Sequence, residues 1–221
     1  MAPPAFVIDC DGTLVDTERL WTIAKRATTE HFGATWSESL RGTLTGTALE
    51  TCAQVIAEQA GRPREAPAVA AYLTSALSEI LESQPVNAHE GAAELLLALA
   101  ERGIAVAVAS NGRPVDVEIA LDRSGLAGLV AAVRCPGPGL SPKPEPDLYL
   151  AACGDLGREP EWSVAIEDAP AGVLAARRAG LLTLGLTSPG AGALDADLAI
   201  DSLWPLDIDA LVAMLPWRRG S

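Results

Sequence analysis

Short runs of apolar residues recur along the chain, and each has the length of a β-strand. Segments with helical periodicity precede or follow them. The runs are almost continuously apolar rather than alternating with polar residues, which is typical of parallel strands covered by helices on both faces. The pattern therefore predicts an α/β fold whose core is a doubly wound, Rossmann-like parallel sheet. The expected strands are residues 5–9, 104–110, 129–133, 163–167 and 181–186.

The interval between residues 15 and 84 departs from this alternation, because it contains no convincing strand pattern. We expect a core domain formed by residues 1–14 and 86–221, into which a small helical domain is inserted at residues 15–85. Glycine and proline near residue 62 mark a turn inside the insertion. Its helix-length segments are residues 18–30, 48–60 and 66–82.

Composition agrees with one substantial core and one small additional module. The chain has 221 residues, of which 49% are apolar. Its 29 acidic and 16 basic residues give a formal charge of -13, so we expect no nucleic acid and no anionic membrane surface among its partners. The longest apolar stretch, residues 95–109, is interrupted by Glu101 and Arg102 and is not expected to span a bilayer.

Cysteine spacing and the first residues bear on the compartment. The four cysteines lack the short paired spacing of a zinc site or a disulfide framework, which favours reduced thiols. The residues before Asp9 contain no basic segment followed by an apolar stretch, so we expect no signal peptide. We expect a cytoplasmic protein that acts as a monomer.

The first expected strand runs directly into two carboxylates, Asp9 and Asp11, followed by Gly12. In an open α/β sheet, ligands bind at the carboxyl ends of the strands. A period of two along the strand points both aspartates toward the same side. Cys10 lies between them and is expected to point away into the core, where its acidic neighbours would raise its pKa. Taken alone, this segment fits a solvated acidic turn equally well.

Polar residues follow other segments that lead to the same edge of the sheet. The second strand ends in Ser110-Asn111-Gly112, and Lys143 lies in a proline-rich loop. The fourth strand ends in Glu167-Asp168, an acidic pair that is costly to bury unless it is paired or binds a metal. Together they predict a Mg²⁺ site at which a phosphoryl group is transferred, because Mg²⁺ prefers carboxylates and substrate phosphate oxygens.

These segments resemble, in order and spacing, the four motifs of the haloacid dehalogenase-like superfamily, in particular its branch with a helical cap. The resemblance covers nearly the whole chain. It implies that residues 15–85 are a mobile cap that closes over the site and selects the substrate, with the specificity loop near residues 40–45. The matching segments are FVIDCDGTLVDTE, VAVASNG, LSPKPEPDLYL and VAIEDAPAGVLAARRAG.

The resemblance also implies a role for each motif residue. Asp9 would be the nucleophile that forms an aspartyl-phosphate, and Asp11 the general acid and base. Mg²⁺ would be held by the Asp9 and Asp168 carboxylates and the Asp11 backbone carbonyl, with Glu167 bound directly or through water. The transferred phosphate would be bound by Ser110 and Lys143, assisted by Asn111. The expected reaction is hydrolysis of a small phosphorylated metabolite, such as a sugar, polyol or glycolate phosphate.

Several alternatives share parts of this pattern. A β-phosphoglucomutase-like mutase would carry a histidine where this chain has Trp21 and an arginine where it has Thr45, although Arg41 could substitute. In a response-regulator receiver the acidic pair precedes the nucleophile, whereas here it follows. A dehalogenase has no use for Asp11. A catalytically silent phosphate-binding protein is the remaining alternative, and it is disfavoured because every motif acid is present.

Overall fold

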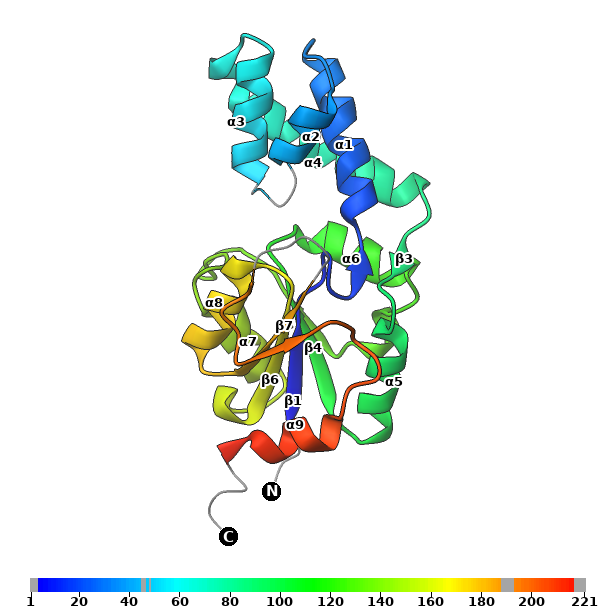
Figure 1. The fold of residues 1–221 in the computed structure, drawn as a ribbon, viewed down its shortest axis with the longest axis vertical. Coiled ribbons are helices and arrows are strands. Elements are labelled where there is room, and N and C mark those ends of the chain that lie inside the picture. Colours follow the sequence, from blue (N-terminus) through cyan, green and yellow to red (C-terminus); the bar gives the residue numbers. More distant parts are fainter. Residues whose placement is uncertain (1–3, 45–46, 48, 188–192, 217–221) are drawn as a thin grey trace. The chain divides into compact units, whose positions relative to one another are not determined.

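The computed structural model describes residues 4–44, 47, 49–187 and 193–216 (Figure 1). It divides into two compact units, one of which is formed by two separate segments of the chain. The first unit comprises Met1–Asp16 and Val86–Ser221, and the second comprises Thr17–Pro85. The first unit extends to Asp16 because β2 (Val15–Asp16) pairs in antiparallel fashion with β3 (Asn87–Ala88).

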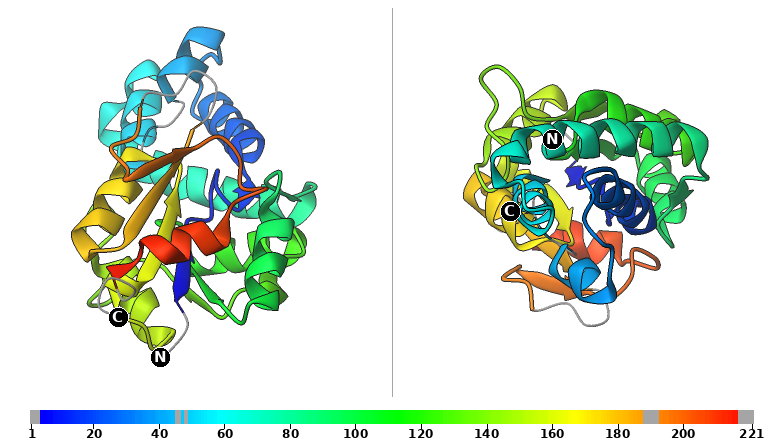
Figure 2. Two further views of the ribbon diagram at one scale, coloured as in Figure 1. Left: turned by 60° about the horizontal axis from the view of Figure 1, so that its bottom comes forward. Right: turned by 90° about the horizontal axis from the view of Figure 1, so that it is seen from above.

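The first unit contains a six-stranded, fully parallel sheet in the order β5-β4-β1-β6-β7-β8. Helices flank this sheet (Figures 1 and 2), so the predicted α/β fold is confirmed. The central strand β1 is completely buried, as its unbroken apolar sequence predicts. The strands are β1 (Ala5–Ile8), β4 (Ala105–Ala109), β5 (Ala132–Arg134), β6 (Ser163–Glu167), β7 (Leu182–Leu186) and β8 (Leu198–Ile200). The helices are α5 (Ala92–Glu101), α6 (Pro114–Arg123), α7 (Asp147–Asp155), α8 (Pro170–Ala179) and α9 (Ile208–Met214).

One strand prediction needs correction, and one strand of the sheet was not predicted. The run at residues 129–133 is not one strand, because Ala127–Leu129 forms a 3-10 turn and β5 begins only at Ala132. Leu126, just before the turn, is 1% exposed, whereas none of the three residues of the turn is buried. An apolar run alone does not distinguish such a segment from a strand. The edge strand β8 was not predicted, because three residues are too few to establish a pattern.

The second unit is helical. Its helices are α1 (Glu18–His31), α2 (Glu38–Leu44), α3 (Leu49–Gln59) and α4 (Ala66–Ser83), with a 3-10 turn at Pro63–Glu65. In α4 the buried residues Val69, Leu73, Leu77 and Leu81 recur every four positions and form one apolar stripe. The segment expected as a loop from residue 40 onward is helical as far as Leu44. The Lys25 ammonium group donates to the carbonyl oxygen of Leu44 (2.6 Å) and so satisfies the end of α2.

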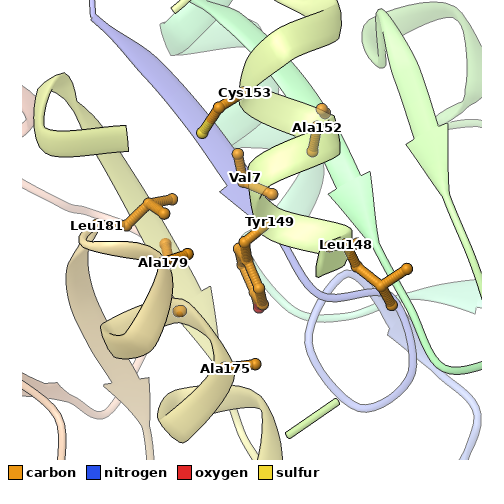
Figure 3. Close-up of a cluster of buried hydrophobic side chains, with 12 residues drawn as sticks. Val7, Leu148, Tyr149, Ala152, Cys153, Ala175, Ala179 and Leu181 are labelled. Atoms are coloured by element: carbon orange, nitrogen blue, oxygen red, sulfur yellow. The ribbon is translucent and has the colours of Figure 1, made fainter. Parts of the chain in front are cut away.

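The layer between the sheet and helices α7 and α8 forms a tight core beneath the carboxyl edge of the sheet. Many of its members are alanines, which allow close approach of the helices. Figure 3 shows Tyr149 projecting from α7 into this cluster. No helix among the described residues combines the length and the apolar character needed to cross a bilayer.

Candidate active site

The carboxylates of Asp9, Glu167 and Asp168 lie together at one edge of the sheet. One oxygen atom from each lies within 4.8 Å of the other two. This proximity follows from the strand register, because β1 and β6 are parallel neighbours with Ile8 opposite Ile166. The amide N–H of Asp9 continues the pairing by donating to the carbonyl oxygen of Ile166 (3.0 Å). The predicted convergence of these acids is therefore observed.

The surroundings of the acidic pair disfavour its charged form. Burial, reinforced by the charges of Asp9 and Glu167, raises the pKa of Asp168 to about 7. Burial also raises the pKa of Glu167, although the neighbouring Lys143 opposes this effect. The pKa values rise because several negative charges share a space with little water.

The Lys143 ammonium group joins two of these acids. Its Nζ atom lies 2.5 Å from Asp9 Oδ1 and 2.5 Å from Glu167 Oε1, and the lysine side chain is only 4% exposed. Burial alone would lower the pKa of Lys143, but the two carboxylates raise it above its ordinary value. A buried ammonium group with two carboxylate partners remains charged. Lys143 is thus positioned at the Asp9 carboxylate, as expected for a group that neutralises a phosphoryl group there.

The side chains of Asp11 and Ser110 face each other beside this cluster. The Ser110 hydroxyl lies 3.4 Å from Asp11 Oδ2 and accepts a hydrogen bond from the amide N–H of Gly112 (2.9 Å). A Cβ atom at Gly112 would lie 3.1 Å from Ser110 Oγ and 3.5 Å from Asp11 Oδ2, so glycine allows the close approach of these groups. The phosphate-binding role of Ser110 and the acid-base role of Asp11 stay predictions.

The side chain of Asn111 binds the backbone of the loop that carries Lys143. Its side-chain oxygen accepts from the Lys143 amide N–H (2.8 Å), and its side-chain nitrogen donates to the Lys143 carbonyl oxygen (3.2 Å). The amide therefore binds both backbone groups of Lys143, a role that the sequence did not indicate. Asp147 adds a further bond, accepting from the Ser141 amide N–H (2.9 Å). A direct contact of Asn111 with phosphate stays a prediction.

Two glycines allow the chain to approach the carboxylates. Gly12 has a φ of 84°, and a Cβ atom there would overlap the Asp168 carboxylate. A Cβ atom at Gly172, in the first turn of α8, would overlap the Glu167 carboxylate. Any other residue would force these acids to move.

Tyr149 is a participant that the sequence reasoning missed. Its hydroxyl donates to Glu167 Oε1 (2.6 Å), the same oxygen that binds Lys143, and its side chain is completely buried. Burial and the charge of Glu167 raise the pKa of Tyr149 well above its ordinary value, so its hydroxyl stays protonated. The sequence offered one indication of this contact, namely an aromatic residue with a hydroxyl group six positions after Lys143.

Cys10 is buried, as predicted, and its expected lack of a nucleophilic role stays a prediction. Burial first, and then the charges of Asp11 and Asp9, raise the pKa of this thiol well above its usual value. A thiol in such surroundings is inert at neutral pH.

The cap residues proposed from sequence belong to the second unit. Trp21 lies on α1, where the Lys25 ammonium group is 5.7 Å from its ring centroid. Arg41 lies on α2, and its Nε atom is 2.8 Å from Glu38 Oε2 on the exposed surface of that helix. Thr45 lies outside the described residues. Substrate contacts of all three stay predictions.

The residues present fit a magnesium ion. The three carboxylates provide only oxygen donors, which suit a hard cation. They face a single ammonium group, so the cluster carries excess negative charge when all four groups are ionised. Burial first, and then the charges of Asp9 and Glu167, raise the pKa of Asp168, and a divalent cation at this place would favour its charged form.

Comparisons with known proteins agree with this geometry. The family model of the haloacid dehalogenase-like hydrolases matches residues 3–180. Validoxylamine A 7'-phosphate phosphatase of Streptomyces hygroscopicus subsp. limoneus is 33% identical over 208 residues, covering 90% of this chain and 95% of that protein. Hexitol phosphatase A of Escherichia coli (strain K12) is 32% identical over 194 residues, covering 83% of each chain.

A solved structure extends the likeness to three dimensions. A variant of CbbY from Rhodobacter sphaeroides, crystallised in complex with xylulose-(1,5)bisphosphate, superposes with a TM-score of 0.77 at 25% identity. The match covers 95% of this chain and 99% of that one. The likeness therefore includes both units of the chain.

Proposed function

The chain belongs to the haloacid dehalogenase-like hydrolase family, and we propose that within it the protein is a Mg²⁺-dependent phosphatase of small phosphorylated metabolites. Relatives named as phosphatases support its assignment as a phosphoric monoester hydrolase. The observation that carries the proposal is the Lys143 ammonium group shared between Asp9 and Glu167, with Asp168 beside them. A nucleophile, a cation for phosphate and an acidic metal site thereby occupy one edge of the sheet.

Asp9 acts as the nucleophile in this proposal. Its carboxylate oxygen attacks phosphorus, the bond from phosphorus to the leaving oxygen breaks, and an aspartyl-phosphate forms. Lys143, already 2.5 Å from Asp9 Oδ1, donates to a phosphoryl oxygen as negative charge moves toward the leaving group. The hydroxyl of Ser110, assisted by Asn111, orients the phosphate.

Asp11 transfers the protons. As a carboxylic acid it protonates the departing alkoxide, and as a carboxylate it then takes a proton from the water that attacks the phosphorus of the aspartyl-phosphate. Hydrolysis releases inorganic phosphate and restores Asp9. The Ser110 hydroxyl, 3.4 Å from Asp11 Oδ2, is in place to orient this carboxyl group.

Asp9, Asp168, the Asp11 carbonyl and Glu167, directly or through water, would hold the Mg²⁺, which supplies charge neutralisation for the phosphoryl oxygens. The donor set and the raised pKa of Asp168 support this assignment.

We assign substrate selection to the helical unit as a cap, and we propose hydrolysis rather than phosphosugar transfer. Relatives named for validoxylamine A 7'-phosphate and hexitol support a sugar or polyol phosphate as substrate. Trp21 stands where a mutase would carry a histidine, and an indole ring cannot exchange a proton in that role. We further propose a cytoplasmic monomer that binds neither nucleic acid nor membranes.

The test is a phosphatase assay with a chromogenic aryl phosphate and a panel of sugar, polyol and glycolate phosphates. We expect phosphate release that requires Mg²⁺, and no turnover by Asp9→Asn, because the amide cannot attack phosphorus. Circular dichroism of the variant checks that the isosteric change preserves the fold. Full activity in excess chelator, or substantial activity of Asp9→Asn, would contradict the proposal.

A further inference from the structure

Glu167 is the most enclosed acid of the site, and Tyr149 closes one side of it. Oxygen Oε1 of Glu167 accepts two hydrogen bonds, from Lys143 Nζ at 2.5 Å and from the Tyr149 hydroxyl at 2.6 Å. Two donors on one oxygen restrict rotation of the carboxylate. They also couple the position of Glu167 to that of the lysine.

Tyr149 touches both members of this pair. Its hydroxyl binds Glu167, and its ring centroid lies 5.4 Å from Lys143 Nζ, within reach of a cation–π contact. The ring is fixed by the core cluster between α7, α8 and the sheet (Figure 3). Because the ring is fixed by packing, its hydroxyl has a fixed position beside Glu167 and Lys143.

The backbone of α8 also approaches Glu167. The first turn of α8 approaches so closely at Gly172 that a Cβ atom would overlap the Glu167 carboxyl group. The carboxylate is therefore restrained both by the α8 backbone and by the Tyr149 hydroxyl. Of these two restraints, only the hydroxyl is a directional bond.

We propose that Tyr149 is a positioning residue, whose hydroxyl orients Glu167 and, through Glu167, the Lys143 ammonium group. The inference rests on the proposed function, since it assigns Lys143 to phosphate and Glu167 to the metal site. Without the hydroxyl, Glu167 can rotate and the ammonium group loses its fixed orientation toward Asp9. Tyr149 itself does not touch the substrate.

The decisive variant is Tyr149→Phe, which removes one oxygen atom and keeps the ring. We expect kcat to fall about tenfold, as typical for loss of a hydrogen bond to a charged group, and the dissociation constant of Mg²⁺ to change about threefold or more. Calorimetric titration with Mg²⁺ measures the second quantity on the substrate-free protein. Unchanged kcat together with unchanged Mg²⁺ affinity would overturn the proposal.

Two control variants separate positioning from stability. Tyr72→Phe makes the same chemical change at the other tyrosine, which stacks on His31 in the helical unit. Cys153→Ala removes one heavy atom from the same core cluster, without touching Glu167. We expect both variants to keep the kcat and the Mg²⁺ affinity of the wild type. If Cys153→Ala lowers kcat as much as Tyr149→Phe does, the effect is only structural and the inference fails.

A double-mutant cycle tests the route through Glu167. If Tyr149 acts on the site through this carboxylate, Tyr149→Phe should change Mg²⁺ affinity less in the Glu167→Gln background than in the wild type. Equal changes in both backgrounds would overturn the inference. Because this measurement uses no substrate, it can succeed even if the phosphatase assay fails, and it can fail even if that assay succeeds.

Discussion

In the α/β unit, Asp9, Lys143 and Glu167 at the carboxyl edge are buried and share partners, whereas the ion pairs of the helical unit lie on its surface. Lys143 and Glu167 have side chains only 4% and 1% exposed. Arg26 and Glu30, by contrast, are 62% and 54% exposed, and join successive turns of α1. A buried network depends on each member, because removing one leaves an uncompensated charge. An exposed pair contributes little, since water replaces either partner.

The largest effect on stability is expected for Lys143→Met, which keeps an unbranched side chain one atom shorter and removes its charge. The carboxylates of Asp9 and Glu167 would then be buried without a cation. We expect the free energy of unfolding, measured in urea without metal at about pH 8, to fall by about 3–5 kcal/mol, with loss of phosphatase activity. A change below about 1 kcal/mol would show that Asp9 and Glu167 do not depend on the charge of Lys143 for stability.

The second prediction concerns pH and Mg²⁺. The pKa of Asp168, raised to about 7, means that the folded metal-free protein binds a proton more tightly than the unfolded chain does. Its stability is therefore expected to fall as pH rises from the ordinary carboxyl range near about 4 toward about 7. Mg²⁺ competes with this proton, so its binding strengthens over the same interval.

We expect Mg²⁺ affinity to be about tenfold higher at about pH 8 than at about pH 6, and the thermal stabilisation by Mg²⁺ to be correspondingly larger. Calorimetric titration and thermal melts at both pH values measure these quantities. In Asp168→Asn, which removes one of the two acids with a raised pKa, the difference in affinity between the two pH values should be smaller. An equal affinity of the wild type at both pH values would contradict a site whose acids must lose protons to bind the ion.

The part of this site that lies at strand ends could be predicted from sequence, because parallel register brings residues after neighbouring strands together. Asp9 follows β1 and Glu167 ends β6, and these strands pair directly. Lys143 was recognisable from its proline-rich loop. Tyr149 was not, because its contact with Glu167 depends on how α7 docks against the sheet. The contact of Asn111 with the Lys143 loop likewise depends on two loops meeting in space.

The elements of the fold likewise divide into those that the sequence predicts and those that it does not. The strand Ser163–Glu167 is predicted correctly, because its centre, Val164-Ala165-Ile166, is an unbroken apolar segment. The prediction of a strand over residues 129–133 is wrong at its start, because an apolar run also occurs where a partly exposed 3-10 turn ends. The two-residue pairing of β2 with β3 had no detectable pattern, although it determines that the first unit extends to Asp16.

The smallest effect on stability is expected in the helical unit, at Arg41. Its side chain is 46% exposed and that of its partner Glu38 is 79% exposed, so Arg41→Ala should change the free energy of unfolding by less than about 0.5 kcal/mol. If Arg41 contacts the leaving group of the substrate, KM should rise about tenfold at unchanged stability. Arg26→Ala, which breaks an equally exposed pair on α1, should leave both quantities unchanged. Urea denaturation and steady-state kinetics on the preferred substrate measure the two effects separately. An unchanged KM for Arg41→Ala would show that this arginine, like Arg26, is only a solvated surface residue.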